Sequence, residues 1–270
     1  MKYSIVLSTQ PAQFQAATFK GDLQTNLARI AALAYDGVEL AIRDPKLVDL
    51  SNLEQLIQEQ GLSVSAIGTG QAWGEEGLSF TDPDSTVRKA AIERIKNHIP
   101  GAVRFQAIII IGLIRGVVKS GVDSVQAMDW LVEALIECSR AALPHGIRLA
   151  LEPINRYETT LINTAAQGLD LIQRVGESNF GLLLDTFHMN IEEPDIYNSI
   201  RICGEHTFHF HVADSNRLYP GAGHLDFKSI LETLAATGYS GWVSGEFLPI
   251  PDALSAADKN IVALKQYQIN

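Results

Sequence analysis

The sequence has few cysteines, few basic residues and no long apolar run, and each shortage argues against a class of protein. Its two cysteines, Cys138 and Cys203, are far apart on expected helices, so we expect reduced, buried thiols and no disulfide framework. Lysine and arginine number 21 against 31 acidic residues and form no cluster, which argues against a nucleic-acid partner. No apolar run reaches the roughly 18 residues of a membrane span, and the first run is too short for a secretory signal. We therefore expect a cytoplasmic protein without a membrane partner.

A Gly-x-Gly-x-x-Gly motif is also missing after the first apolar run, which argues against an open sheet of the dinucleotide-binding type. The chain instead alternates short apolar runs with segments of helical periodicity. The expected strands cover residues 3–8, 37–42, 62–67, 106–111, 147–152, 180–185, 207–212 and 242–246. The expected helices cover residues 22–34, 84–103, 124–143, 195–204, 226–236 and 256–267, and two more begin at capping boxes, Ser51 with Glu54 and Thr164 with Gln167. Eight such units predict an α/β fold, a single (β/α)8 TIM barrel over residues 1–270.

The connection over residues 69–83 is the longest that this pattern leaves without a strand or helix. It is rich in glycine and acidic residues and contains Trp73. A loop of this length in a barrel is typical either of a lid over the active site or of a mobile segment without function, and the sequence leaves both interpretations open.

Four consecutive expected strands of the C-terminal half each end in a residue that can bind a metal or transfer a proton. These residues are Glu152, Asp185, His211 and Glu246. In a (β/α)8 barrel such positions open on one rim, where catalysis takes place. Because side chains alternate along a strand, inward-facing ligands require the flanking Leu151, Leu184 and Val212 to face the helices.

Three carboxylates on one rim raise the pKa of one another unless a cation neutralises them. A divalent metal answers this requirement, and oxygen ligands with one imidazole favour Mn2+ or Mg2+, with Co2+ or Zn2+ as alternatives. His209 lies one layer deeper than His211, and we expect it to be a hydrogen-bonded core histidine or a support for a ligand. Glu39, near the end of the second strand, is a weaker prediction of the same kind. For any single residue, a paired charge at a strand end is the alternative.

The motifs around these residues resemble those of a known family. They are Glu152-Pro-Ile-Asn-Arg-Tyr-Glu158, Leu184-Asp-Thr-Phe-His188-Met-Asn, His209-Phe-His-Val-Ala-Asp-Ser-Asn-Arg217 and Pro220-Gly-Ala-Gly-His224. They resemble the sugar isomerase and epimerase superfamily of xylose-isomerase-like barrels, and within it the ketose 3-epimerases of the D-tagatose and D-psicose type. The resemblance implies that the four strand-end residues bind the metal, that Glu152 and Glu246 also exchange protons with the substrate, and that the ketose oxygens near C1 and C2 are held by Glu158, His188 and Arg217.

The chemistry expected of such a site is removal of a proton beside a carbonyl. A metal bound to neighbouring oxygens of a ketose would acidify the hydrogen at C3 and stabilise a cis-enediolate. Two glutamates on opposite faces of that planar species would invert C3, whereas a single base would interconvert aldose and ketose. We therefore expect a C3 epimerase. A sugar-phosphate epimerase, an aldose-ketose or hydroxypyruvate-type isomerase and a non-catalytic sugar-binding barrel stay open, as does assembly into a homo-oligomer.

Smaller signals concern a phosphate and the remaining histidines. Arg115, after the fourth strand, is expected either to contact a phosphate or carboxylate at the distal end of the substrate or to be a solvated loop residue. Gly221 and Gly223 predict either a backbone cradle for an anion or a tight turn under Arg217. His98 has no partner pattern and is expected at the surface.

Overall fold

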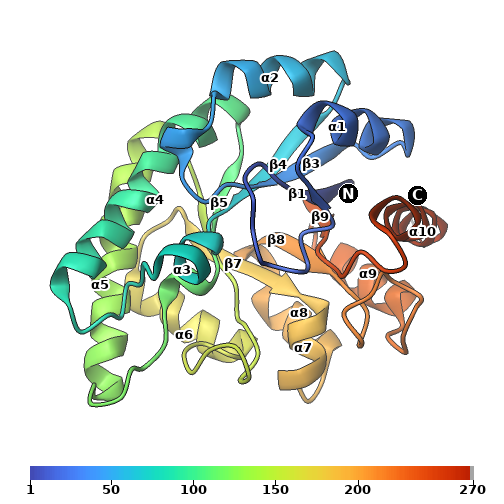
Figure 1. Ribbon diagram of the computed structural model, residues 1–270. Coiled ribbons are helices and arrows are strands. Elements are labelled where there is room, and N and C mark those ends of the chain that lie inside the picture. The colour runs from blue at the N-terminus through green and yellow to red at the C-terminus, as the bar shows by residue number, and fades with distance from the viewer. Residues whose placement is uncertain (268–270) are drawn as a thin grey trace.

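The computed structural model, which describes residues 1–267, is a closed barrel of eight parallel strands inside a ring of helices (Figure 1). The strands are β1 Lys2–Ser8, β2 Phe19–Lys20, β3 Gly37–Ala41, β4 Ser63–Gly68, β5 Ile108–Ile111, β6 Leu149–Leu151, β7 Phe180–Asp185, β8 Thr207–Val212 and β9 Trp242–Gly245. Neighbours pair in sequence order from β1 and β3 to β9, and β9 pairs with β1 to close the ring. The two-residue β2 pairs with the outer end of β1. The TIM barrel predicted from the alternation is confirmed.

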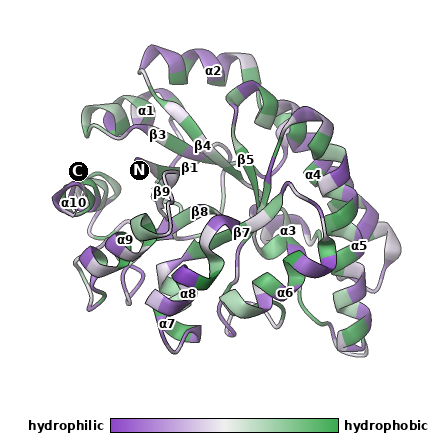
Figure 2. Ribbon diagram, turned by 180° about the vertical axis from the view of Figure 1, so that it is seen from behind, coloured by the Kyte–Doolittle hydropathy of each residue, from purple (hydrophilic) through white to green (hydrophobic). Residues whose placement is uncertain are grey.

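The helices cover the outside of the barrel and carry both hydrophilic and hydrophobic residues, as helices with one buried face do (Figure 2). They are α1 Leu23–Ala32, α2 Leu50–Glu59, α3 Gln71–Glu76, α4 Ser85–Phe105, α5 Ser124–Ala142, α6 Ala165–Val175, α7 Thr186–Glu192, α8 Ile196–Cys203, α9 Phe227–Ala236 and α10 Ala253–Gln266. Short 3-10 turns cover Pro45–Leu47, Leu113–Arg115, Leu143–His145 and Gly204–His206. None of the described helices combines the length and apolar character that crossing a bilayer requires.

Most of these helices have an aspartate N-cap, whose side chain accepts hydrogen bonds from backbone N–H groups of the first turn. The capping box predicted at Thr164 and Gln167 is confirmed. The one predicted at Ser51 is wrong, because Asp49 caps α2 and accepts from the N–H groups of Ser51 and Asn52. Two short helices, α3 and α7, were not predicted from the periodicity; each is too short to show a period.

The interior of the barrel follows the predicted alternation. One buried cluster inside the ring consists of Ala66, Ile108, Ile110, Ala150 and Leu183. The neighbouring Leu151, Leu184 and Val212 belong to the larger core between barrel and helices, as predicted. Both cysteines are buried and unpaired by disulfide, which confirms that prediction.

His98 on α4 corrects the expectation of a surface histidine, since it is almost fully buried. Within residues 1–267 neither of its ring nitrogens has a hydrogen-bond partner. Burial, with a smaller contribution from the charge of Arg94 and against that of Asp44, lowers the pKa of His98 from 6.5 to about 3. The imidazole is therefore neutral in the folded protein at pH values where the unfolded chain would protonate it.

We expect the free energy of unfolding to fall as the pH drops below about 6.5, because His98 then takes up a proton only on unfolding. At pH 4.5 the cost would be about 3 kcal/mol, two pKa units at about 1.4 kcal/mol each. Urea unfolding between pH 4.5 and 7.5 should therefore give a shallower pH profile for His98→Leu than for the wild type. The exposed His145 provides a matched control, His145→Leu. Parallel profiles for wild type and His98→Leu would contradict the assignment.

Candidate metal centre and active site

Four residues at the carboxyl ends of consecutive strands meet at one point of the barrel mouth. They are Glu152 after β6, Asp185 at the end of β7, His211 in β8 and Glu246 after β9. One ligand atom from each lies within 4.8 Å of the others. The Nδ1 atom of His211 is 3.7 Å from Asp185 Oδ2 and 3.9 Å from both Glu152 Oε1 and Glu246 Oε2. These separations are too long for hydrogen bonds and leave room for an ion between the groups.

The chemistry of this donor set fits a divalent cation. Among the described residues, neither His211 Nδ1 nor Glu152 Oε1 has a hydrogen-bond partner, although both are buried. Burial first, and then the charge of Glu246, raises the pKa of Glu152 well above its usual range. Burial likewise raises the pKa of Glu246. A divalent cation among the three carboxylates would remove both the repulsion and the unpaired lone pairs.

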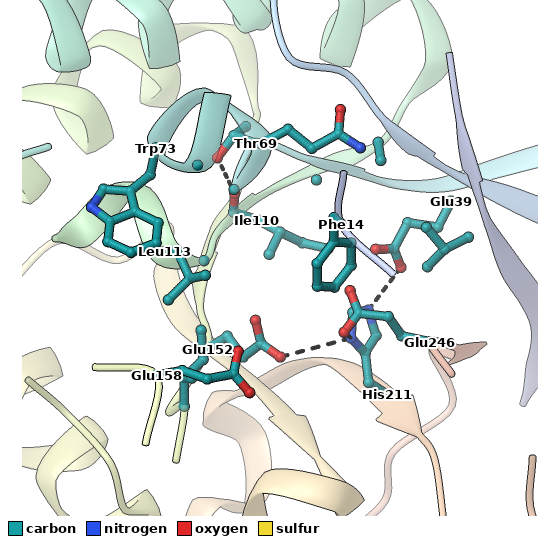
Figure 3. Close-up of a pocket in the computed structure, with 18 of the residues that line it drawn as sticks. Phe14, Glu39, Thr69, Trp73, Ile110, Leu113, Glu152, Glu158, His211 and Glu246 are labelled. Atoms are coloured by element: carbon teal, nitrogen blue, oxygen red, sulfur yellow. Dashed lines mark hydrogen bonds and ion pairs between the residues drawn. The ribbon is translucent and has the colours of Figure 1, made fainter. Parts of the chain in front are cut away.

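Glu39 on β3 pairs with the imidazole of His211 and orients it (Figure 3). Its Oε2 atom accepts hydrogen bonds from Nε2 of His211 at 2.9 Å and from Nε2 of His209 at 2.8 Å. Although burial opposes it, the charge of His211 and these two hydrogen bonds hold the pKa of Glu39 well below its usual range. An ionised Glu39 fixes the proton of His211 on Nε2 and turns Nδ1 toward the carboxylates. His209 is thus hydrogen-bonded in the core, as expected, and does not face the four-residue cluster.

The three residues that the family resemblance assigns to substrate binding lie beside this cluster. Nη1 of Arg217 donates to Glu158 Oε1 at 2.8 Å, and Nη2 lies 3.7 Å from Glu246 Oε2. Nε2 of His188, on α7, is 3.5 Å from Glu152 Oε1. Although burial opposes it, the charge of His188 lowers the pKa of Asp185, which also caps α7. The end of β7 therefore positions both Asp185, a potential metal ligand, and His188 on the helix that Asp185 caps.

Sequence reasoning missed Asn155, which connects two of these groups. Its amide nitrogen donates to Glu158 Oε1 at 2.9 Å and lies 2.8 Å from Nδ1 of His188. As a donor to Nδ1, Asn155 leaves the ring proton of His188 on Nε2, the nitrogen nearest Glu152. The signal was present in the first family motif, where Asn155 lies between Glu152 and Glu158, but its partner lies on a helix that the periodicity does not reveal.

A cavity of about 320 Å³ opens above the cluster. Its walls include apolar residues from segments far apart in sequence, among them Phe14, Trp73, Ile110 and Leu113 (Figure 3) and also Ile154. The sequence did not predict Phe14 as a residue of the site. The guanidinium of Arg217 lies 5.6 Å from the ring of Phe14 and 4.8 Å from the ring of Phe187. Trp73 lies on α3, which the hydrogen bond from Thr69 to the carbonyl of Ile110 ties to the end of β5. The 69–83 segment thus lines the pocket, and its opening and closing stays a prediction.

Both interpretations of Arg115 need correction. Its side chain is fully buried, so it is not a solvated loop residue. It is not among the residues that line the cavity, and it donates to the backbone carbonyls of Gly112, Leu161 and Ile162. These hydrogen bonds connect two loops, so the role of Arg115 is structural. Its position after a strand in the sequence does not reveal this role. The structure does not support a contact of Arg115 with the distal end of a substrate.

The fold and the site together define a parallel barrel with a three-carboxylate, one-histidine cluster at its catalytic rim. Residues 27–266 match the family model described as "Xylose isomerase-like TIM barrel", and the chain belongs to this family. It is 32% identical over 235 residues to an L-ribulose 3-epimerase of Mesorhizobium japonicum, covering 86% of this chain and 78% of that one. It is 31% identical to a D-psicose 3-epimerase of Ruminiclostridium cellulolyticum, covering 90% and 82%. A solved D-allulose 3-epimerase of Methylomonas sp. in complex with D-allulose has a TM-score of 0.85 at 25% identity, covering 99% and 97%.

These similarities confirm two predictions from the sequence. The motifs at the strand ends do mark a xylose-isomerase-like barrel with ketose 3-epimerases among its relatives. The prediction that the protein is an isomerase, of the epimerase type, is likewise confirmed.

Proposed function

We propose that the protein inverts C3 of an unphosphorylated ketose with a divalent metal, Mn2+ first, held by Glu152, Asp185, His211 and Glu246. The observation that carries the proposal is the convergence of these four groups at one point beneath a cavity. The similarity to epimerases that are named for L-ribulose and D-psicose supports a ketose as substrate. A cation held there would act as a Lewis acid toward neighbouring substrate oxygens and acidify the hydrogen at C3.

In this proposal, proton transfer is assigned to Glu152 and Glu246. They follow β6 and β9, which β7 and β8 separate in the ring, and both line the cavity. One carboxylate removes the proton of C3 on one face, and the other returns a proton on the opposite face, which inverts the carbon. Glu158, His188 and Arg217 hold the oxygens near C1 and C2, and Asn155 fixes the hydrogen-bonding state of two of them.

The charge of the cavity favours a neutral sugar over a phosphate ester. Among the described residues that line it, Arg217 is the one arginine or lysine, and Glu158 already pairs with it. A phosphate at the distal end would meet the apolar wall of Trp73 and Leu113 and the carboxylate of Glu75. An anion left unpaired in such a place loses its hydration without compensation.

We expect the Mn2+-loaded protein to epimerise free ketoses such as D-psicose or L-ribulose with a kcat/KM at least about tenfold above that for their terminal phosphates, a difference of about 1.4 kcal/mol in the transition state. Product analysis by chromatography, with hydroxypyruvate included in the panel, measures the ratio. A phosphate ester that reacts faster than its parent sugar would contradict the proposed substrate. Absence of turnover on every ketose, with metal bound, would overturn the proposed function itself.

A further inference from the structure

The loop between β8 and α9, residues 213–226, presents Arg217 to the active site without a helix or strand to support it. The backbone of Arg217 has a φ of 61°, in the left-handed region that side chains other than glycine seldom adopt. Its N–H donates to the carbonyl of Asp214, and its carbonyl accepts from the N–H of Leu248. Such a conformation persists only where the surrounding structure holds it in place.

The carboxylate of Asp214 holds this loop together from the inside. It is fully buried, and its Oδ1 accepts from the N–H groups of Ser215 at 2.7 Å and Leu225 at 3.2 Å. Its Oδ2 accepts from the N–H of Gly221 at 2.9 Å. Although burial opposes it, these backbone hydrogen bonds, together with that of Gly223, lower the pKa of Asp214. One ionised side chain thus ties both ends of the loop to its middle.

Gly223 shows how closely the loop encloses this carboxylate. A Cβ atom at position 223 would lie 2.3 Å from Asp214 Oδ1 and 2.5 Å from the Ser215 hydroxyl. The two interpretations of these glycines from the sequence, an anion cradle and a tight turn, therefore apply to the same segment. Gly221 and Gly223 do surround an anion in a tight turn near Arg217, and that anion is the side chain of Asp214.

The side chain of Arg217 depends on where this loop puts it. Its guanidinium donates to Glu158, approaches Glu246 and lies between the rings of Phe14 and Phe187. Within residues 1–267 Asp214 makes no hydrogen bond to any of these groups, yet its hydrogen bonds hold together the loop that carries Arg217. We propose that Asp214 is a positioning residue, which sets the guanidinium of Arg217 against Glu158 and Glu246 for substrate binding; this inference rests on the proposed function.

A double-mutant cycle tests whether Asp214 acts through Arg217. Asp214→Asn keeps the shape of the side chain but faces an amide group toward N–H donors, so we expect a 10- to 100-fold loss of kcat/KM on the best ketose. In an Arg217→Met background the same change should cost less than about threefold, because the group that Asp214 positions is already absent. Mn2+ affinity, measured by chelator competition, should stay within about twofold of the wild type, since the loop supplies no metal ligand.

Two further variants keep the test decisive. Asp258→Asn, the same substitution at an exposed position of α10, should leave kcat/KM unchanged. Gly223→Ala displaces the Asp214 carboxylate by steric overlap without removing its charge, and it replaces Asp214→Asn if that variant does not fold. Equal losses in both Arg217 backgrounds would overturn the positioning role. If the wild type has no epimerase activity, the proposed function fails, and the same cycle on ketose binding by calorimetry still decides the role of Asp214.

Discussion

Replacing Glu246 by glutamine is expected to abolish inversion while one-sided proton exchange continues. Loss of one proton-transfer group typically costs 10²- to 10⁴-fold in rate, so net epimerisation should fall by roughly 10³-fold. Glu152 can still remove the proton of C3 from the epimer that presents it on its own face, and can return it there. In deuterium oxide that epimer should gain deuterium at C3 without changing configuration.

The partner variant makes this prediction sharper. Glu152→Gln should exchange the C3 hydrogen of the other epimer only. In an NMR exchange experiment started from each pure epimer, each variant should therefore incorporate deuterium into one epimer, and the two variants into different ones. Both residues are potential metal ligands, so the reactions are run at saturating Mn2+ with the bound metal measured. Glu232→Gln, on the exposed face of α9, is the matched control for the substitution itself. Exchange of the same epimer by both variants, or inversion at the wild-type rate by either, would rule out two-sided proton transfer.

Strand ends are the part of the site that the sequence predicts well, and alternation along the chain is the reason. Glu152, Asp185, His211 and Glu246 each follow an apolar run, and parallel strands of a barrel bring such positions to one rim whatever the loops do. The inward and outward faces could be predicted for the same reason, since side chains alternate in direction. These inferences need only local sequence and one topological rule.

Loops and single buried polar groups could not be predicted, because their surroundings come from distant parts of the chain. Phe14 lies near Arg217 only because the β1–α1 connection folds over the barrel mouth. His98 and Arg115 are polar residues whose burial depends on helices and loops packed against them, and their sequence neighbours carry no sign of it. Asn155 becomes informative only once α7 places His188 beside it. The sequence pattern reports periodicity, whereas these contacts depend on tertiary packing.

Glu39 shows how the barrel interior supports the rim. The residue was a weak prediction because nothing in the second strand distinguishes it from a paired charge. Its role becomes clear from the hydrogen bonds of both β8 histidines to one of its oxygens, which connect β3 to β8 across the barrel, past β1 and β9. The orientation of His211 is therefore fixed by β3, a strand that supplies no residue to the four-residue cluster.

Stripping the metal with a chelator is expected to abolish turnover and to lower the Tm, and the loss of Tm should be larger at pH 8 than at pH 5.5. Burial raises the pKa of Glu152 and of Glu246 in the metal-free protein above the usual 4.5, and the charges of neighbouring carboxylates, Glu246 for Glu152 and Asp185 for Glu246, add to it. The folded state then binds more protons than the unfolded chain, so these two groups make the stripped protein less stable as the pH rises above 4.5. A metal replaces those protons and reverses the penalty.

Scanning calorimetry of stripped and Mn2+-loaded protein at both pH values measures the effect. Free metal at 100 times its Kd stabilises by about 2.7 kcal/mol, which corresponds to roughly 5–10 °C in Tm for a chain of this size. Taking the difference between loaded and stripped protein at each pH cancels the contribution of His98, which has the opposite sign. Turnover should return on adding Mn2+. A shift of equal size at both pH values would show that protons and metal do not compete for the same carboxylates, and the electrostatic account of this cluster would then fail.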